Sequence, residues 1–195
     1  MRDIRHAGAA VGVLVLPGGK VASRERARGW QLAQVRAAGL AVGLRRRLGA
    51  GYRVEQVRYR FRGWNTPELD AVNDAEEVLR AMRAGCERVV LVGHSMGGRV
   101  AVRLAAEHDV SAVVALAPWW PAGDAGVMPV SCRLRVVHGT ADRWTDPESS
   151  RRQVDSARRR GVDAEWRGIE GAGHFMMYRP GLWHDLAAGF VESAG

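Results

Sequence analysis

Three short stretches of the sequence carry side chains that together could perform nucleophilic catalysis. Ser95 lies in GHSMGG, Asp142 in HGTAD and His174 in GAGH. A serine hydroxyl is scarcely ionised at neutral pH, so it needs a neutral imidazole within hydrogen-bond reach to take its proton. The imidazole in turn needs a carboxylate on its far nitrogen to fix its tautomer and stabilise the imidazolium. Ser95, His174 and Asp142 are therefore candidates for one catalytic triad.

The residues around Ser95 predict a strained turn between a strand and a helix. A branched apolar run at 88–92 precedes Ser95, and a helical pattern follows over 96–107. Gly93 and Gly97 remove the Cβ atoms that would clash when Ser95 takes an unfavourable backbone conformation. A strand, then G-x-S-x-G, then a helix is the context that a nucleophile elbow requires. Because the pattern alone also occurs by chance, the interpretation depends on the positions of the base and the acid.

The rest of the chain alternates between short apolar runs and longer amphipathic stretches. Strands are expected at 11–16, 52–59, 88–92, 112–116, 134–138 and 164–167. Helices are expected at 67–84, where Thr66 is a plausible N-cap, at 96–107, from 147 toward 160, and at 182–192. This alternation predicts a mostly parallel sheet of about six strands with helices on both faces. Ligands of such sheets bind at the C-terminal ends of the strands.

The candidate acid and base both follow predicted strands, as Ser95 does. Asp142 lies in the loop after 134–138, and His174 lies in the loop after 164–167. Asp146 competes with Asp142, but its position before Pro147 is typical of a helix N-cap. His94 and His138 lie inside the motif blocks, where we expect packed or hydrogen-bonded roles rather than catalytic ones.

With GHSMGG, HGTAD and GAGH in this order, the chain resembles the α/β-hydrolase family over nearly its full length. The resemblance implies Ser95 as nucleophile, His174 as general base and acid, and Asp142 as the residue that orients His174. It also implies an oxyanion hole made by backbone N–H groups. One would be that of Met96, and the other would come from LPGGK, with Gly19 preferred and Lys20 as the alternative.

The chain departs from the family pattern in two places. It begins at what looks like the family's third strand, so we expect a reduced sheet. Only about 17 residues separate Leu116 from Leu134, too few for the helical lid of many relatives. We therefore expect one α/β-hydrolase domain over residues 1–195, without a lid domain, and an open site that favours small or surface-accessible substrates.

Several large apolar side chains lie in the loops predicted at the C-terminal edge of the sheet. They are Trp64, Trp119, Trp120, Trp144, Met128 and Phe175. They could line an apolar acyl or alcohol pocket, or they could simply anchor their loops. A further helical stretch, which ends near the arginines at 45–47, is expected between the first two strands. Trp30 is expected to pack on this helix and Trp183 on the helix at 182–192.

Composition limits the partners of the protein. The net charge is +8 and the sequence pI is about 10.8, but Lys20 is the only lysine and the other basic residues are arginines. This bias is typical of a GC-rich coding genome, so we expect no specific nucleic-acid partner. No apolar run approaches the roughly 20 residues that span a bilayer. The pattern leaves the oligomeric state open.

The N-terminal stretch MRDIRHAGAAVGVLVL has the outline of a secretory signal. Asp3 and His6 interrupt it, and PGGK follows where a cleavage site would be, so a buried strand is the better interpretation. Cys86 and Cys132 precede strands that would flank a third strand, too far apart for a disulfide. Reduced thiols predict a cytoplasmic protein.

The sequence thus predicts a serine hydrolase that cleaves carboxylic esters through an acyl-enzyme. A thioester substrate would use the same triad, and nothing in the triad excludes an amide. The alternative from another class is a binding protein that kept the hydrolase fold and lost turnover. We expect no cofactor and no metal, because the histidines lie on separate elements and the cysteines are unpaired.

Overall fold

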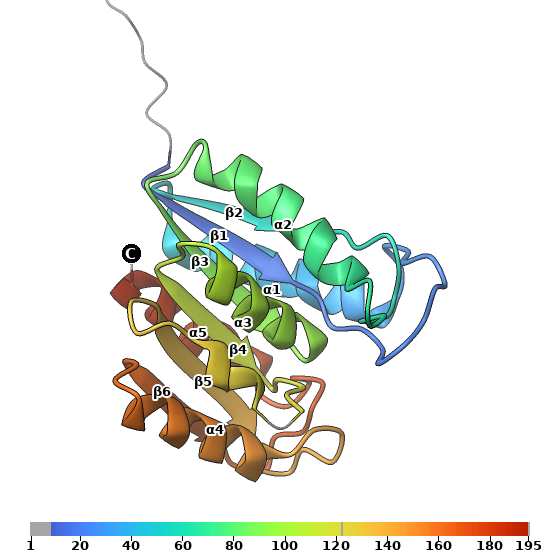
Figure 1. The fold of residues 1–195 in the computed structure, drawn as a ribbon, viewed down its shortest axis with the longest axis vertical. Coiled ribbons are helices and arrows are strands. Elements are labelled where there is room, and N and C mark those ends of the chain that lie inside the picture. Colours follow the sequence, from blue (N-terminus) through green and yellow to red (C-terminus); the bar gives the residue numbers. More distant parts are fainter. Residues whose placement is uncertain (1–8, 122, 195) are drawn as a thin grey trace, which may run out of the picture.

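A six-stranded, fully parallel sheet forms the centre of the protein (Figure 1). The computed structural model describes residues 9–121 and 123–194; the first eight residues, which carry the arginines of the leader-like pattern, lie outside this part. In spatial order the strands are β2 (Tyr52–Gln56), β1 (Val11–Leu16), β3 (Arg88–His94), β4 (Ala112–Leu116), β5 (Arg133–Gly139) and β6 (Ala164–Ile169). All six predicted strands are confirmed.

Helices cover both faces of the sheet, as predicted (Figure 1). Helices α1 (Leu32–Leu48) and α5 (Pro180–Ala194) pack on one face. Helices α2 (Asp70–Arg83), α3 (Met96–Glu107) and α4 (Pro147–Arg159) pack on the other. Successive strand residues point to opposite faces, so Leu91 joins one core while Val90 and Val92 join the other. None of the described helices is long and apolar enough to cross a membrane.

Two predicted elements are shorter in the structure. Strand β2 ends at Gln56 rather than at residue 59. Helix α2 begins at Asp70 rather than at residue 67, so the prediction of Thr66 as its N-cap is wrong. Leu69 adopts the left-handed conformation, with φ of 52°, which excludes a helix continuing back through it. The Asn65 amide holds this turn, donating to the Asp70 carboxylate (2.9 Å) and to the Ser23 carbonyl (3.1 Å).

The order of the strands creates a switch point beside β1. The chain leaves β1 for β2 on one side and later returns to place β3 on the other side. In the register of these strands Leu16 pairs with Gly93, so the loops after β1 and β3 leave the sheet side by side. A switch point of this kind, at the C-terminal ends of parallel strands, is where open α/β sheets bind their ligands.

The connection from β4 to β5 is short. Its described residues contain only the four-residue 3-10 helix η1 (Asp124–Val127), which packs beside α3 and α4. No helical lid is evident there, as predicted from the length of the segment. The C-terminal edge of the central strands is therefore not covered by this connection.

Two glycines allow the first turn of α3 to pack directly on the strands. A Cβ atom at Gly97 would lie 2.1 Å from the carbonyl oxygen of Leu16, at the end of β1. A Cβ atom at Gly93 would lie 2.2 Å from the carbonyl oxygen of Gly97. Both distances are far below van der Waals contact with backbone atoms that cannot move independently. The predicted requirement for glycine on both sides of Ser95 is confirmed.

We expect Gly97→Ala to lower the free energy of unfolding by about 2 kcal/mol or more, because the added methyl group must displace β1 from α3. Gly39→Ala, a matched change inside helix α1, meets no atom within 4 Å. It should stabilise the protein by about 0.5–1 kcal/mol. Urea unfolding of both variants measures the difference. Equal stabilities would contradict the close contact at Gly97.

Candidate active site

Ser95 lies at the turn between β3 and α3 in a strained conformation. Its φ of 55° and ψ of −118° are rare for a residue with a side chain. Three backbone hydrogen bonds hold it there. The Ser95 N–H donates to the Leu116 carbonyl (3.0 Å), while the Ser95 carbonyl accepts from Gly98 (3.0 Å) and Trp119 (3.1 Å). The strain is thus supported by β4 and the loop that follows it.

The three predicted side chains meet in one row of hydrogen bonds. The Ser95 Oγ lies 3.0 Å from His174 Nε2. On the other side of the ring, His174 Nδ1 lies 2.8 Å from Asp142 Oδ2. His174 comes from the loop after β6 and Asp142 from the loop after β5, and all three side chains are buried. The row joins the ends of three strands at one edge of the sheet.

The Asp142 carboxylate accepts several hydrogen bonds besides the one from His174. Its Oδ1 accepts from the backbone N–H groups of Trp144 (2.8 Å) and Thr145 (3.0 Å). Its Oδ2 accepts from the Thr145 hydroxyl (2.9 Å) and contacts His138 Nε2 (3.1 Å). Burial raises the pKa of Asp142, but these hydrogen bonds, those of His138 and His174 first, outweigh it and hold the pKa well below its usual value. Asp142 is therefore ionised at neutral pH.

His138 is the site residue whose contacts the sequence did not identify. It is completely buried, and its Nδ1 lies 2.8 Å from the Ser150 Oγ. The Ser150 Oγ also lies 2.8 Å from the Pro147 carbonyl oxygen and accepts from Trp166 Nε1 at 2.9 Å. His138 thus joins helix α4 to the Asp142 carboxylate. The prediction of a hydrogen-bonded role for this residue is confirmed, and the four-residue spacing in HGTAD was the available signal.

The neighbouring ring of His94 stays neutral. Its Nε2 lies 2.9 Å from the His174 carbonyl, an acceptor, so this nitrogen carries the proton. Its Nδ1 is buried without a partner among the described residues. Burial, with the charges of His174 and Arg36, lowers the pKa of His94 to about 3 against the hydrogen bond to the carbonyl. His94 therefore fixes the backbone of His174 without competing for protons.

Asp146, the alternative acid, is used elsewhere. Its side chain caps helix α4 by accepting from the Glu148 N–H at 2.9 Å. It also contacts Arg152 at 3.4 Å. Its carboxylate makes no hydrogen bond with His174, whereas that of Asp142 does. Between the two aspartates, only Asp142 lies in the row with Ser95.

A cavity of about 450 Å³ opens beside Ser95 and His174. Its lining residues are Gly18, Gly19, Lys20, Val21, Leu32, Ala33, Arg36, His94, Ser95, Trp119, Trp144, Thr145, His174 and Phe175. Of the predicted pocket residues, the structure brings Trp119, Trp144 and Phe175 into this lining. The Trp144 ring stacks near His174, with 6.4 Å between ring centroids, and meets Phe175 edge-on at 5.2 Å. These three rings give the cavity an apolar side next to the imidazole.

The other predicted pocket residues do not line this cavity. Trp64, Trp120 and Met128 are buried in the core between the sheet and helices α2–α4. Trp64 meets Trp119 edge-on at 6.4 Å, and the Arg99 guanidinium packs against both rings. Trp64 therefore supports the wall of the cavity from behind, because its side chain points inward from its loop.

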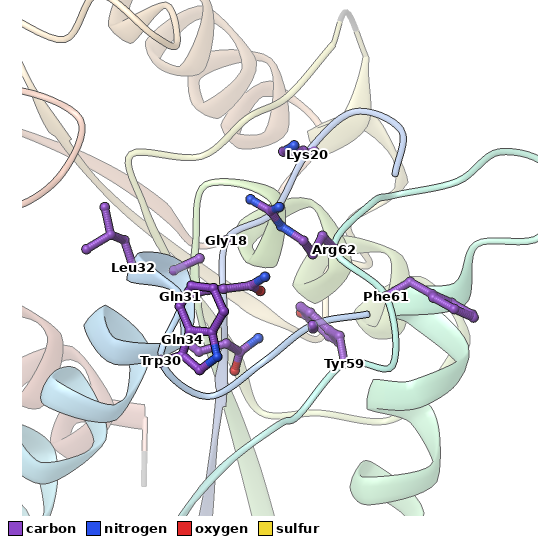
Figure 2. A pocket seen from close by; sticks show the side chains of 12 residues that line it. Gly18, Lys20, Trp30, Gln31, Leu32, Gln34, Tyr59, Phe61 and Arg62 are labelled. Atoms are coloured by element: carbon purple, nitrogen blue, oxygen red, sulfur yellow. The ribbon is translucent and has the colours of Figure 1, made fainter. Parts of the chain in front are cut away.

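A second cavity of about 480 Å³ adjoins the first (Figure 2). The two share Gly18, Gly19, Lys20, Leu32 and Ala33. Figure 2 shows Trp30, Gln31 and Gln34 on one side of it and Tyr59 and Arg62 on the other. The expectation that Trp30 packs on a helix is wrong, because it precedes α1 and is 74% exposed at this cavity. The same expectation is confirmed for Trp183, which lies on α5 and is fully buried.

The loop after β1 lies directly over the turn at Ser95. A Cβ atom at Gly18 would lie 3.4 Å from the Ser95 Cβ, and one at Gly19 would lie 2.5 Å from the Met96 Cε. The Lys20 N–H donates to the Arg62 carbonyl at 2.7 Å, so it is already occupied. The Met96 N–H opens helix α3, where first-turn donors have no partner within the helix.

Within residues 9–121 and 123–194, no group of three or more His, Cys, Asp or Glu side chains is arranged to hold a metal ion.

The model of the alpha/beta hydrolase family matches residues 13–131, more than half of the chain. The chain belongs to the alpha/beta hydrolase family. The matched stretch of this hydrolase-family protein begins within β1 and includes the turn at Ser95, but it stops before Asp142 and His174. A comparison with curated proteins gave no match.

Solved structures share the fold over nearly the whole chain. One of the similar structures, from work on two metagenome-derived lipolytic enzymes, is 16% identical with a TM-score of 0.68 and covers 96% of this chain and 95% of its own. An alpha-beta serine hydrolase homologue from Coxiella burnetii is 18% identical, with a TM-score of 0.69 and coverages of 97% and 88%. An acetyl ester-xyloside bifunctional hydrolase from Caldicellulosiruptor lactoaceticus is 14% identical, with a TM-score of 0.74 and coverages of 99% and 85%. At these identities the likeness establishes the fold.

The low pKa of His94 predicts a stability change in acid. The ordinary pKa of histidine is 6.5, whereas the pKa of His94 in the folded protein is about 3. Between these two pH values, the unfolded chain binds a proton at this ring that the folded protein does not. The contribution of His94 to the free energy of unfolding should therefore fall as the pH is lowered through this window, by up to about 1.4 kcal/mol per pH unit. An NMR titration of the imidazole C–H signals, assigned with His94→Gln, checks this. A His94 midpoint near 6.5 would contradict the neutral, buried ring.

Proposed function

We propose that the protein is a serine hydrolase that cleaves carboxylic esters through an acyl-enzyme. The observation that carries this proposal is the continuous row from Ser95 Oγ through His174 to Asp142, with distances of 3.0 and 2.8 Å, beside an open cavity. Such a row is able to remove the proton from a hydroxyl as it attacks a carbonyl.

In the first half of the proposed reaction, Ser95 Oγ attacks the ester carbonyl carbon and its proton passes to His174 Nε2. The imidazolium that forms is stabilised by the ionised Asp142 on the far side of the ring. The tetrahedral intermediate collapses when its bond to the alcohol oxygen breaks and His174 gives its proton to that oxygen. The products of this half are the free alcohol and an ester between the acyl group and Ser95.

In the second half, His174 takes a proton from a water molecule, whose oxygen attacks the acyl carbon. The bond to Ser95 Oγ then breaks, and the proton on His174 returns to this oxygen. The net reaction consumes one ester and one water and releases one alcohol and one acid. The carbonyl oxygen carries negative charge in both tetrahedral intermediates.

We assign the stabilisation of this oxygen to the backbone N–H groups of Met96 and Gly19. Met96 follows the nucleophile at the start of α3, where the helix also supplies a favourable field. Gly19 is favoured over Lys20 because the Lys20 N–H is engaged by the Arg62 carbonyl. Removing one such donor typically lowers the rate about 10²–10³-fold.

Ester substrates are favoured by the similar structures, which include proteins described as lipolytic enzymes and as an acetyl ester-xyloside bifunctional hydrolase. The triad would cleave a thioester by the same steps, with a thiol in place of the alcohol. Parallel assays of para-nitrophenyl acetate and acetyl thiocholine measure this preference. The short β4–β5 connection, whose described residues form no helical lid, and the open cavity favour substrates that need no enclosure.

A fluorophosphonate probe tests the proposal directly. We expect the probe to label Ser95, because attack of its oxygen on phosphorus expels fluoride and leaves a stable phosphonyl ester. Mass spectrometry of a digest should locate the adduct on the peptide that contains Ser95. Ser95→Ala should abolish labelling and His174→Ala should slow it by at least about 10³-fold, because the base is lost.

The contrary outcome is equally clear. Folded protein that is not labelled, and that does not hydrolyse activated esters, would mean that the serine is not activated. The protein would then be a binding protein with the hydrolase fold. Far-UV circular dichroism of each variant excludes loss of the fold as the cause.

His138→Gln should lower kcat about 10–100-fold, because supporting hydrogen-bond partners of reacting groups typically contribute this much. KM should change little, since His138 is completely buried and does not line the cavity. His108→Gln is a matched control, because this ring lies at the opposite end of α3 beside Glu76. A His138→Gln enzyme with unchanged kcat would show that the carboxylate keeps its position without His138.

A further inference from the structure

Arg36 places a positive charge in the same cavity as Ser95. It lies on helix α1, is partly buried and lines the cavity together with Phe175 and His174. Its guanidinium carbon lies 4.9 Å from the centre of the Phe175 ring. The guanidinium is also close enough to His94 to contribute to the low pKa of that ring. Arg36 therefore faces the reacting groups.

No counter-charge accompanies Arg36 in the described part of the chain. It forms no ion pair there, and its Nε is buried without a hydrogen-bond partner. The cavity lining contains no aspartate and no glutamate. On the same helix, Arg47 pairs with Asp185 at 2.7 Å. The other cation of the lining, Lys20, has Glu25 at 4.0 Å.

The position of the guanidinium suits a ligand that supplies the missing charge. A half-buried charge without a partner is unfavourable, and an anion that reached it would gain from the reduced screening. Stacking over an aromatic ring leaves the N–H groups at the edge of the guanidinium free to donate. Two parallel N–H groups match the oxygens of a carboxylate or a phosphate.

We propose that the substrate of this site carries an anionic oxygen group, a carboxylate or a phosphate, that binds Arg36 while its ester carbonyl lies at Ser95. This inference rests on the proposed hydrolase function and narrows it from esters in general to acidic esters. The apolar rings of Trp144 and Phe175 would contact the carbon chain between the two groups.

Two esters with acyl groups of equal carbon number test the proposal. They are the mono-para-nitrophenyl ester of adipic acid, which ends in a carboxylate, and para-nitrophenyl hexanoate, which ends in a methyl group. We expect the ratio of kcat/KM values, acidic over neutral, to fall about 10–100-fold in Arg36→Gln, as for the loss of a hydrogen bond to a charged group. Arg36→Lys should restore part of the ratio, because it keeps the charge but loses the paired N–H geometry.

Arg46→Gln is the matched control. It removes the same charge from the same helix, but Arg46 is exposed and outside the cavity. The ratio of kcat/KM values, acidic over neutral ester, should stay within about twofold of the ratio in the unmodified protein, because exposed charges are screened by solvent and salt. An equal fall in both variants would assign the effect to net charge and overturn the proposal.

The two proposals fail in different ways. If neither ester is cleaved and the fluorophosphonate does not label Ser95, the hydrolase function is wrong. If the hexanoate ester is cleaved and Ser95 is labelled, but the ratio is the same with and without Arg36, only the acidic-substrate inference is wrong.

Competitive inhibition distinguishes the two anions. Monomethyl adipate and pentyl phosphate are compared as inhibitors of hexanoate ester hydrolysis. The anion that the site recognises should inhibit at a concentration that rises at least about tenfold in Arg36→Gln. If the inhibition constants of both anions are the same with and without Arg36, the inference is overturned.

Discussion

The contact between the first turn of α3 and the end of β1 is the constraint on which the rest of the site depends. The backbones approach so closely that no side chain fits at Gly97 or Gly93. This approach places the strained Ser95 over the switch point, where the loops after β1 and β3 run side by side. The hydroxyl, the Met96 N–H and the Gly18–Gly19 loop are therefore positioned by one packing arrangement. A displacement of α3 would move all of them together.

Buried polar groups complete this arrangement, and the hydrogen bonds of each group determine its charge. Asp142 keeps its charge because backbone N–H groups and two imidazoles surround it, although burial opposes the charge. His94, packed next to His174 at 5.0 Å between ring centroids, has one hydrogen bond and stays neutral. In the low dielectric of the interior, hydrogen bonds are stronger than in water, so they stabilise the ionised form of Asp142 and the neutral form of His94. His94 and His174 thus have different roles at the same edge of the sheet, and in the proposed mechanism only His174 exchanges protons.

The sequence predicted the sheet, the helices and the meeting of Ser95, Asp142 and His174, because strand order and glycine spacing act through the backbone. It did not predict what depends on side-chain direction. Trp64 lies in a loop at the correct edge, yet its ring points into the core against Arg99. Arg36 was missed because one arginine on a helix among many basic residues has no distinguishing pattern. The left-handed turn at Leu69 likewise follows from a distant contact of Asn65 with Ser23.

The absence of a lid in the described β4–β5 connection affects what can determine specificity. In an enclosed site, excluded water strengthens every polar contact with the substrate. Here the cavity is open, so charges at its rim, such as Lys20 beside Glu25, are screened. Arg36 differs because Phe175 covers one face of the guanidinium and its Nε is buried. The proposed selection of acidic esters depends on this partly desolvated charge, because solvent screens its field less than that of an exposed charge.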